Sequence, residues 1–351
     1  MKSFLPSRFP LIQAPLAGAQ DAAMTIAVCR AGGLGSLAAA MLSTDVLAEQ
    51  IETIQAAVDA PFNLNFFAHT LPDVGAAEDQ AWRELLQPFF DEFGIDAGSL
   101  PAGVLRRPFD ESQLAVVEKY RPAVVSFHFG LPEKSLLDAV KASGAMVLSS
   151  ATTLAEGLWL QENGADAVIA QGSEAGGHRG MFLAHQPAAQ LGTFALLPQL
   201  VKALNIPVIA AGGIADTAGI QAALQLGAAA VQLGTAYLLC DESTIGALHR
   251  AAIEKVARHP EQCDTALTNV FSGKPARGLI NRLMREVGLI HPQVMPFPFA
   301  ATASGALRRA AEAQGSTDFT PLWCGQNPSG CKAVSAYDLT RELTAAFSRQ
   351  D

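Results

Sequence analysis

Charged residues are scarce in this chain, and positively charged ones are the scarcer kind. Only 16% of the 351 residues are charged, and 24 lysines and arginines against 33 acidic residues give a formal net charge of −9. Nucleic-acid grooves and surfaces for anionic membranes need a local surplus of basic residues, so we expect neither kind of partner. A small anionic substrate stays compatible with this composition, because one local cationic or hydrogen-bonding site suffices to hold it.

Cysteines and long apolar runs are also few. The five cysteines are odd in number and include no C-x-x-C pair, which argues against a disulfide framework and favours a reducing compartment. Cys324 and Cys331 have no nearby histidine to complete a zinc site, so we expect no metal. No apolar run of about 18 residues occurs, and the first residues lack the apolar segment of a signal peptide. We therefore predict a cytoplasmic protein that does not enter a membrane.

Short apolar runs alternate with helix-length segments as far as about residue 258. These runs are continuously apolar, which is typical of parallel strands buried on both faces. Eight repeats in one chain favour an α/β fold of the (β/α)8 (TIM) barrel type over an open sheet. The expected strands are Leu11–Pro15, Leu34–Ala38, Phe62–Phe67, Val124–Phe129, Met146–Ser150, Ala167–Gln171, Pro207–Ala211 and Ala230–Leu233. Helices are expected at Thr44–Val58, Thr152–Glu162 and Asp216–Leu226, each starting near a residue able to cap it.

Two regions interrupt this alternation. Residues 68–110 separate the third and fourth expected strands with apolar residues at helical spacing, and helical patterns recur near 302–313 and 337–348. Long structureless loops are uncommon in compact domains, so both regions should fold. We predict a barrel from residues 1–67 and 111–258, and a smaller, mostly helical domain from 68–110 and 259–351 that covers the substrate at the barrel mouth.

Glycines follow the seventh and eighth expected strands. The chain has Gly212 and Gly213 after the seventh strand, and Gly234 and Thr235 after the eighth. Barrels often hold a phosphate between these two loops on backbone N–H groups, and glycine lets the phosphate approach the main chain. The alternative is a pair of tight turns without a ligand. A dinucleotide fold is disfavoured, because no P-loop or G-x-G-x-x-G opens a first βαβ unit.

The sixth expected strand leads into Q-G-S-E-A-G-G-H-R-G, residues 171–180. An imidazole at this strand end can donate a hydrogen bond to an anion or accept a proton from a carbon acid, so we predict a catalytic role for His178; the alternative is a loop-capping histidine. His128 ends the fourth strand, where it either contacts substrate or is a hydrogen-bonded core histidine. Glu174 is either a base or a solvated loop residue.

Several blocks of this sequence together resemble class I nitronate monooxygenases, formerly called 2-nitropropane dioxygenases. The blocks are Q-A-P-L-A-G (13–18), A-G-G-L-G-S (31–36), F-H-F-G (127–130), A-D-A-V-I-A-Q-G-S-E-A-G-G-H-R-G (165–180) and P-V-I-A-A-G-G-I…L-G-A-A-A-V-Q-L-G-T (207–235). The resemblance covers roughly residues 11–242, with a weaker echo at L-W-C-G-Q, residues 322–326. Flavin-dependent enoyl-ACP reductases and NADH:quinone reductases share some of these features.

The resemblance implies a non-covalently bound FMN. The implied cofactor-binding residues are Pro15 at the flavin ring, Asn65, Gln171, Gly176, Gly177, Gln232 and Leu233 around the ribityl chain and ring, and Gly212, Gly213, Gly234 and Thr235 at the phosphate. His178 matches the family's active-site histidine, and we assign His128 to substrate binding. The implied reaction is the oxidation of alkyl nitronates, such as propionate 3-nitronate, by O2 through a one-electron-reduced flavin to carbonyl compounds and nitrogen oxides.

Other functions stay open from the sequence. The nearest is an NADH-dependent flavin reductase of quinones or enoyl thioesters on the same barrel. A flavin-free barrel resembling IMP dehydrogenase would need a loop cysteine that residues 171–195 lack, and a non-catalytic flavin carrier would leave His178 without a purpose. Tyrosines are scarce, so we expect Phe297 and Phe299 to form the pocket wall. Neither the oligomeric state nor a role for Arg179 or Arg277 in gripping a substrate carboxylate can be read from the sequence.

Overall fold

The computed structural model describes residues 4–100, 106–184 and 186–349, and it confirms the predicted TIM barrel. The eight parallel strands are β1 (Leu11–Gln13), β2 (Ser36–Ala38), β3 (Asn63–Phe67), β4 (Val124–His128), β5 (Met146–Ala151), β6 (Ala167–Gln171), β8 (Val208–Ala211) and β9 (Ala230–Leu233). Their neighbour order is β1-β9-β8-β6-β5-β4-β3-β2, and a parallel bridge between Ile12 and Leu34 joins the two ends of this order.

Alternation along the strands separates two apolar layers. Ile12, Leu148 and Ile169 belong to a buried cluster that fills the barrel interior. Leu11 and Val168 belong instead to the larger cluster shared with the surrounding helices, because successive side chains of a strand point to opposite faces. The register pairs Gln171 with Ala211 and Ala211 with Gln232. This register brings the ends of β6, β8 and β9 to one level.

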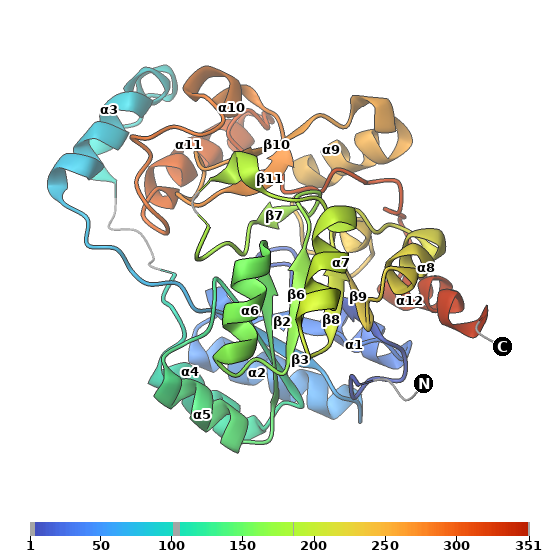
Figure 1. The fold of residues 1–351 in the computed structure, drawn as a ribbon. Helices are drawn as coiled ribbons and strands as arrows, with labels where there is room; N and C mark the ends of the chain where they lie inside the picture. Colours follow the sequence, from blue (N-terminus) through green and yellow to red (C-terminus); the bar gives the residue numbers. More distant parts are fainter. Residues whose placement is uncertain (1–3, 101–105, 185, 350–351) are drawn as a thin grey trace.

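Helices surround the barrel (Figure 1). They are α1 (Ala22–Arg30), α2 (Thr44–Ala57), α4 (Glu111–Tyr120), α5 (Lys134–Ala142), α6 (Leu154–Glu162), α7 (Thr193–Ala203), α8 (Thr217–Gln225) and α12 (Ala336–Thr344). The three helices predicted from the sequence, α2, α6 and α8, begin at side-chain caps. Ser43, Thr153 and Asp216 each accept a hydrogen bond from a first-turn N–H. Such caps are worth about 1 kcal/mol each, which explains why the expected helix starts lie within two residues of the observed ones. None of the helices in the described part of the chain is long and apolar enough to cross a membrane.

A second group of helices lies beyond one end of the barrel (Figure 1). It contains α3 (Ala76–Phe93), α10 (Arg282–Val287) and α11 (Ala301–Ala313), with α9 (Ala247–Arg258) beside it. Trp82 from α3, Leu283 from α10 and Leu307 from α11 are all fully buried in one apolar cluster. The short 3₁₀ helices are η1 (Ala39–Met41), η2 (Ala97–Ser99), η3 (Pro187–Ala189), η4 (Thr235–Tyr237), η5 (Pro260–Gln262) and η6 (Ala345–Arg349). The shared burial of residues from α3, α10 and α11 supports the proposal of a smaller helical unit made from two separate stretches of chain.

Two features of this smaller unit differ from the sequence-based expectation. It contains a three-stranded antiparallel sheet in the order β10 (Thr265–Thr268), β11 (Ala276–Leu279), β7 (Gly177–His178), whose strands are too short to show a periodicity. The last helix, α12, does not belong to it: Ala336, Leu339 and Leu343 pack in the barrel's outer cluster, next to α1 and α8. We therefore propose that the domain division of the sequence holds except that α12 returns to the barrel and that β7, from the barrel stretch, joins the sheet of the smaller unit.

Candidate functional site

A cavity of about 300 Å³ lies where the barrel strands end, within the size range of small-molecule sites. The predicted site residues that line it are Pro15, Asn65, His128, Gln171, Gly176, Gly177, His178, Gly212, Gly213, Gln232, Gly234 and Thr235. Leu233 does not line it. Gln232 points into the cavity, so Leu233, its neighbour on β9, faces the opposite side and is buried among the outer core residues.

The two glycines after β8 have a conformation that other residues rarely adopt. Gly212 has a φ of +111° and Gly213 a φ of +74°, a region that costs L-residues roughly 1–2 kcal/mol. At the neighbouring loop, a Cβ on Gly176 would lie 2.5 Å from the backbone nitrogen of Gly325, so only glycine fits there. Gly212 and Gly213 therefore need glycine for their backbone conformation, and Gly176 needs it for the close approach of Gly325. All three line the cavity.

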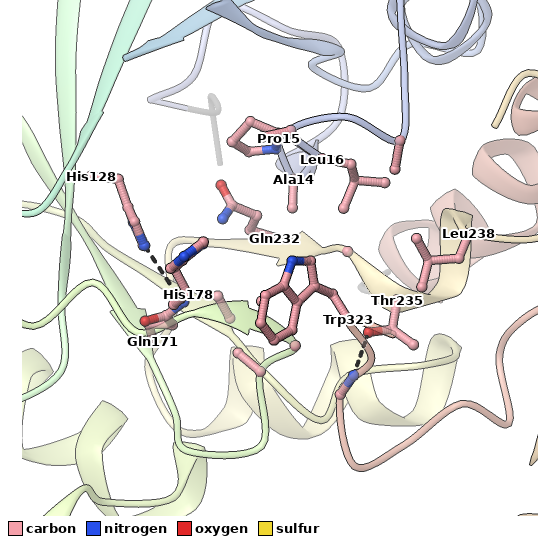
Figure 2. Close-up of a pocket in the computed structure, with 18 of the residues that line it drawn as sticks. Ala14, Pro15, Leu16, His128, Gln171, His178, Gln232, Thr235, Leu238 and Trp323 are labelled. Atoms are coloured by element: carbon pink, nitrogen blue, oxygen red, sulfur yellow. Dashed lines mark hydrogen bonds between the residues drawn. The ribbon is translucent and has the colours of Figure 1, made fainter. Parts of the chain in front are cut away.

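Residues 323–327 pass beside these loops, a contact that the sequence did not predict. The Gly325 N–H donates to the Thr235 Oγ1 at 2.9 Å, and the Asn327 Nδ2 donates to the Gly213 carbonyl at 2.9 Å. Figure 2 shows the Trp323 side chain in this pocket together with His178 and Thr235. Because Thr235 accepts the Gly325 bond, its own O–H stays available as a donor. The weak echo at 322–326 was the one sequence signal for this segment.

Glu174 lines the cavity but is neither solvated nor placed as a free base. Its carboxylate accepts hydrogen bonds from the Thr193 N–H at 2.8 and 2.9 Å and from the Thr193 hydroxyl at 3.0 Å. Thr193 begins α7, so the carboxylate satisfies donors at that helix N-terminus. Glu174 thus orders the 172–180 loop against α7.

His178 lies on β7 with its Nε2 2.8 Å from the Ser272 Oγ. The Ser272 Oγ also lies 3.3 Å from the Lys274 carbonyl, so a Ser272 hydroxyl that donates to this carbonyl would leave the His178 Nε2 to supply the proton in the bond between them. Within the described residues, no group hydrogen-bonds the Nδ1. Burial lowers the pKa of His178 well below 6.5, and the nearby charge of Arg106 lowers it further. The ring is therefore neutral.

His128 and Gln171 hold the backbone of this histidine. The His128 Nε2 donates to the His178 carbonyl at 3.0 Å (Figure 2), and its Nδ1 lies 3.1 Å from the Ser150 Oγ. The Gln171 Nε2 donates to the same carbonyl at 2.9 Å. Burial lowers the pKa of His128 to about 4. Both ring nitrogens of His128 are thus occupied by protein groups, which fits a positioning residue better than the substrate ligand we expected.

The two arginines singled out in the sequence serve the protein's own backbone. Arg179 is fully buried and donates to the carbonyls of Gln171 and Gly172. Arg277 donates to the Ser173 carbonyl at 2.7 Å and to Thr265. Both guanidinium groups donate to carbonyls of the 171–180 loop, and neither arginine lines the cavity. We therefore assign neither of them to substrate binding.

Two other cations flank His178. The Arg106 guanidinium lines the cavity and lies 5.8 Å from the centre of the Phe297 ring, which is itself 5.5 Å from the His178 ring. The Lys274 ammonium lies 4.5 Å from the centre of the Phe129 ring. In the part of the chain that the structure describes, neither cation has a carboxylate partner within 4 Å. Neither phenylalanine expected at the pocket wall lines the cavity: the Phe297 ring packs 5.5 Å from the His178 ring, and Phe299 packs in the cluster of the helical unit.

Comparison with known proteins agrees with this arrangement. A family model described as nitronate monooxygenase matches residues 1–346. The chain is 41% identical over 340 residues to the nitronate monooxygenase of Pseudomonas aeruginosa, covering 95% of each chain, and 40% identical over 337 residues to that of Paraburkholderia phytofirmans, covering 95% of this chain and 91% of the relative.

Solved structures give the same relationship. The nitroalkane oxidase from Streptomyces ansochromogenes superposes with a TM-score of 0.86 at 34% identity, covering 98% of this chain and 97% of that one. FabK from Thermotoga maritima superposes with a TM-score of 0.70 at 26% identity, covering 97% and 93%. The chain therefore belongs to the nitronate monooxygenase family of oxidoreductases.

Proposed function

We propose that the protein uses a non-covalently bound FMN to oxidise alkyl nitronates with O2, giving carbonyl compounds and nitrogen oxides. The observation that carries this proposal is the neutral His178, which lines the same cavity as Arg106 and as the glycine-bearing loops after β8 and β9. Propionate 3-nitronate, which carries a carboxylate as well as the nitronate, is the substrate that we expect to fit best. We expect catalysis in the cytoplasm.

The residues of the cavity fit an FMN at both of its ends. Backbone groups at Gly212, Gly213 and Gly234 and the free O–H of Thr235 suit a phosphate, as in other barrels of this type. Farther along, the Gln232 Oε1 is buried without a hydrogen-bond partner among the described residues. A buried acceptor of this kind is costly unless a ligand donates to it, and a flavin ring has an N–H that can do so. FMN would supply the redox chemistry, which no side chain in the site provides.

The side chains around the cavity have separate roles in binding the substrate and in removing its proton. Arg106 lines the cavity and attracts the anionic substrate, and Lys274 adds a positive charge near His178. The Phe297 and Phe129 rings under these two cations pack 5.5 and 6.0 Å from the His178 ring. The Nδ1 lone pair of His178 can accept the α-proton of a neutral nitroalkane. A nitronate has already lost that proton, so it needs only to be bound. We propose the Nε2–H tautomer for His178, which leaves this lone pair to act as a base and not as the hydrogen-bond donor considered from the sequence.

The direct test is an absorption spectrum of the purified protein followed by anaerobic titration with propionate 3-nitronate. We expect a flavin spectrum, flavin reduction on adding the nitronate, and reoxidation when O2 is admitted. Heat-released cofactor should match FMN in chromatography. Protein that emerges colourless and refuses added FMN would overturn the proposal.

The NADH-dependent reductase remains the second candidate, because FabK shares this fold at 26% identity. Anaerobic mixing with NADH separates the two functions. We expect the flavin to stay oxidised in the presence of NADH. The observation time should be many times longer than the time in which propionate 3-nitronate reduces the flavin. Rapid bleaching by NADH would instead assign the protein to the reductases.

Arg106 is the cation that we expect to bind the carboxylate of propionate 3-nitronate. Arg106→Ala should raise the KM for this substrate about tenfold or more with little change in kcat, since a hydrogen bond to a charged group is worth about 1.5–3 kcal/mol. Ethyl nitronate, which has no carboxylate, should show a much smaller change. Steady-state kinetics with both substrates measure this. Arg107→Ala, an exposed neighbour, is the matched control, and equal losses on both substrates would refute the assignment.

A further inference from the structure

Four of the five cysteines, which are scattered in the sequence, meet in one corner of the fold. Cys263, Cys324 and Cys331 share an apolar cluster beside α9, and Cys240 lies close enough to Cys331 for the charge of Cys331 to raise the pKa of Cys240. All are free thiols, and the fifth cysteine, Cys29, is buried on α1. Within the described residues, no three metal-ligating side chains are arranged to hold a metal ion. The chemistry of this corner is therefore that of thiols.

Two of these thiols form a pair. Their sulfurs approach the same acceptor, the Gly325 carbonyl, which lies 4.0 Å from the Cys263 Sγ and 3.2 Å from the Cys324 Sγ. Cys263 is partly exposed, immediately after η5, whereas Cys324 is fully buried. A dissolved oxidant therefore reaches the Cys263 sulfur before the buried Cys324 sulfur.

The surroundings give the two sulfurs different reactivity. The neighbouring Cys324 thiol and the charge of Arg277 lower the pKa of Cys263, which favours the reactive thiolate. The neighbouring Cys263 thiol and burial raise the pKa of Cys324. Cys331 is buried with its thiol on the Thr235 carbonyl, and burial raises its pKa to about 12. Only Cys263 combines access with thiolate character.

We propose that Cys263 and Cys324 are a peroxide-sensitive pair that closes to a reversible disulfide. The Cys263 thiolate attacks one oxygen of hydrogen peroxide, the O–O bond breaks, and hydroxide leaves and is protonated to water. The Cys324 sulfur then displaces the hydroxyl of the Cys263 sulfenic acid as a second water, forming the S–S bond. The two thiols lose two electrons and two protons in total, and a dithiol such as dithiothreitol returns them.

The position of Cys324 links this pair to the cavity. It lies between Trp323, which lines the cavity 5.6 Å from the His178 ring, and Gly325, which hydrogen-bonds Thr235. A disulfide would tether this stretch to the start of β10, so the segment beside the glycine loops would lose freedom to move away. We infer that the oxidised protein releases its cofactor more slowly. This second step rests on the proposed FMN site, whereas the disulfide itself does not.

Peptide mapping of the whole protein tests the disulfide. After treatment with hydrogen peroxide and alkylation without reductant, we expect two fewer free thiols and one peptide joining Cys263 to Cys324, both reversed by dithiothreitol. Cys263→Ser should abolish the linked peptide, whereas Cys29→Ser should leave it unchanged. Overoxidation of Cys263 without a link, or a link between Cys324 and Cys331, would overturn the proposal.

Flavin fluorescence after strong dilution tests the coupling. The oxidised protein should release cofactor about tenfold more slowly than the reduced protein, and Cys263→Ser should show no difference between peroxide and dithiothreitol. A mapped disulfide with unchanged release would refute the coupling. A mapped disulfide in protein that never binds FMN would contradict the proposed function and leave the thiol pair intact.

Discussion

His178→Asn should keep the yellow colour and the fold while abolishing measurable turnover of neutral nitroalkanes. A positioned base typically contributes about 10²–10⁴ in rate, and the Nδ1 lone pair of His178 is the unused acceptor that the cavity offers. Turnover of a preformed nitronate should fall less, by about tenfold, because no proton has to be removed. Steady-state rates with nitroethane and ethyl nitronate measure the two effects separately.

The control for this variant is His259→Asn, which changes an exposed histidine. Thermal melting and the flavin spectrum should match the unchanged protein in both variants. Unchanged nitroalkane turnover in His178→Asn would refute the assignment. Equal losses for nitroethane and ethyl nitronate would show that His178 binds the substrate and does not act as a base.

The pH dependence follows from the same environment. Burial lowers the pKa of His178 well below 6.5, so the ring is already neutral at pH 7. Nitroalkane turnover should therefore stay level as the pH falls from 7 through 6.5 and drop only when the pH reaches the lowered pKa. A kcat/KM profile that instead falls with a midpoint near 6.5 would contradict a buried, neutral base.

Gly213→Asp should yield colourless protein. The new carboxylate would stand at the predicted phosphate position, where two negative charges about 4 Å apart repel by roughly 4 kcal/mol near a protein surface. The substitution would also force an L-residue into a φ of +74° with its Cβ 3.5 Å from the Glu174 side chain. Together these effects should raise the dissociation constant for FMN by about a thousandfold or more, as measured by quenching of flavin fluorescence.

Two variants separate charge from backbone strain. Gly213→Ala adds strain without charge and should weaken FMN binding about tenfold while leaving the protein yellow. Gly144→Asp places the same carboxylate at another positive φ, on an exposed turn after α5, and should leave FMN binding unchanged. A fully flavinated Gly213→Asp would count against the phosphate site. Colourless Gly213→Ala would show that backbone geometry alone decides binding.

Local signals were sufficient to predict most of the barrel. The continuously apolar runs, the capping residues Ser43, Thr153 and Asp216, and the glycines after β6, β8 and β9 are short-range features, and the eight strands and the three predicted helices follow them within a few residues. In a parallel barrel all strands end at one rim. That rule alone was enough to gather the predicted site residues, apart from Leu233, around one cavity.

The sequence by itself thus determined the barrel, the end of it that carries the site, and the glycine and histidine positions there. Only the tertiary structure decided that His178 meets Ser272, 94 positions away, and that Gly325 contacts Thr235 across 90 positions. It also decided that Arg106, and not Arg179, faces the cavity, and that the thiols of Cys263 and Cys324 meet. The physical reason is that an apolar pattern encodes which face of a segment is buried, but a polar side chain acquires its partner only when distant segments pack together.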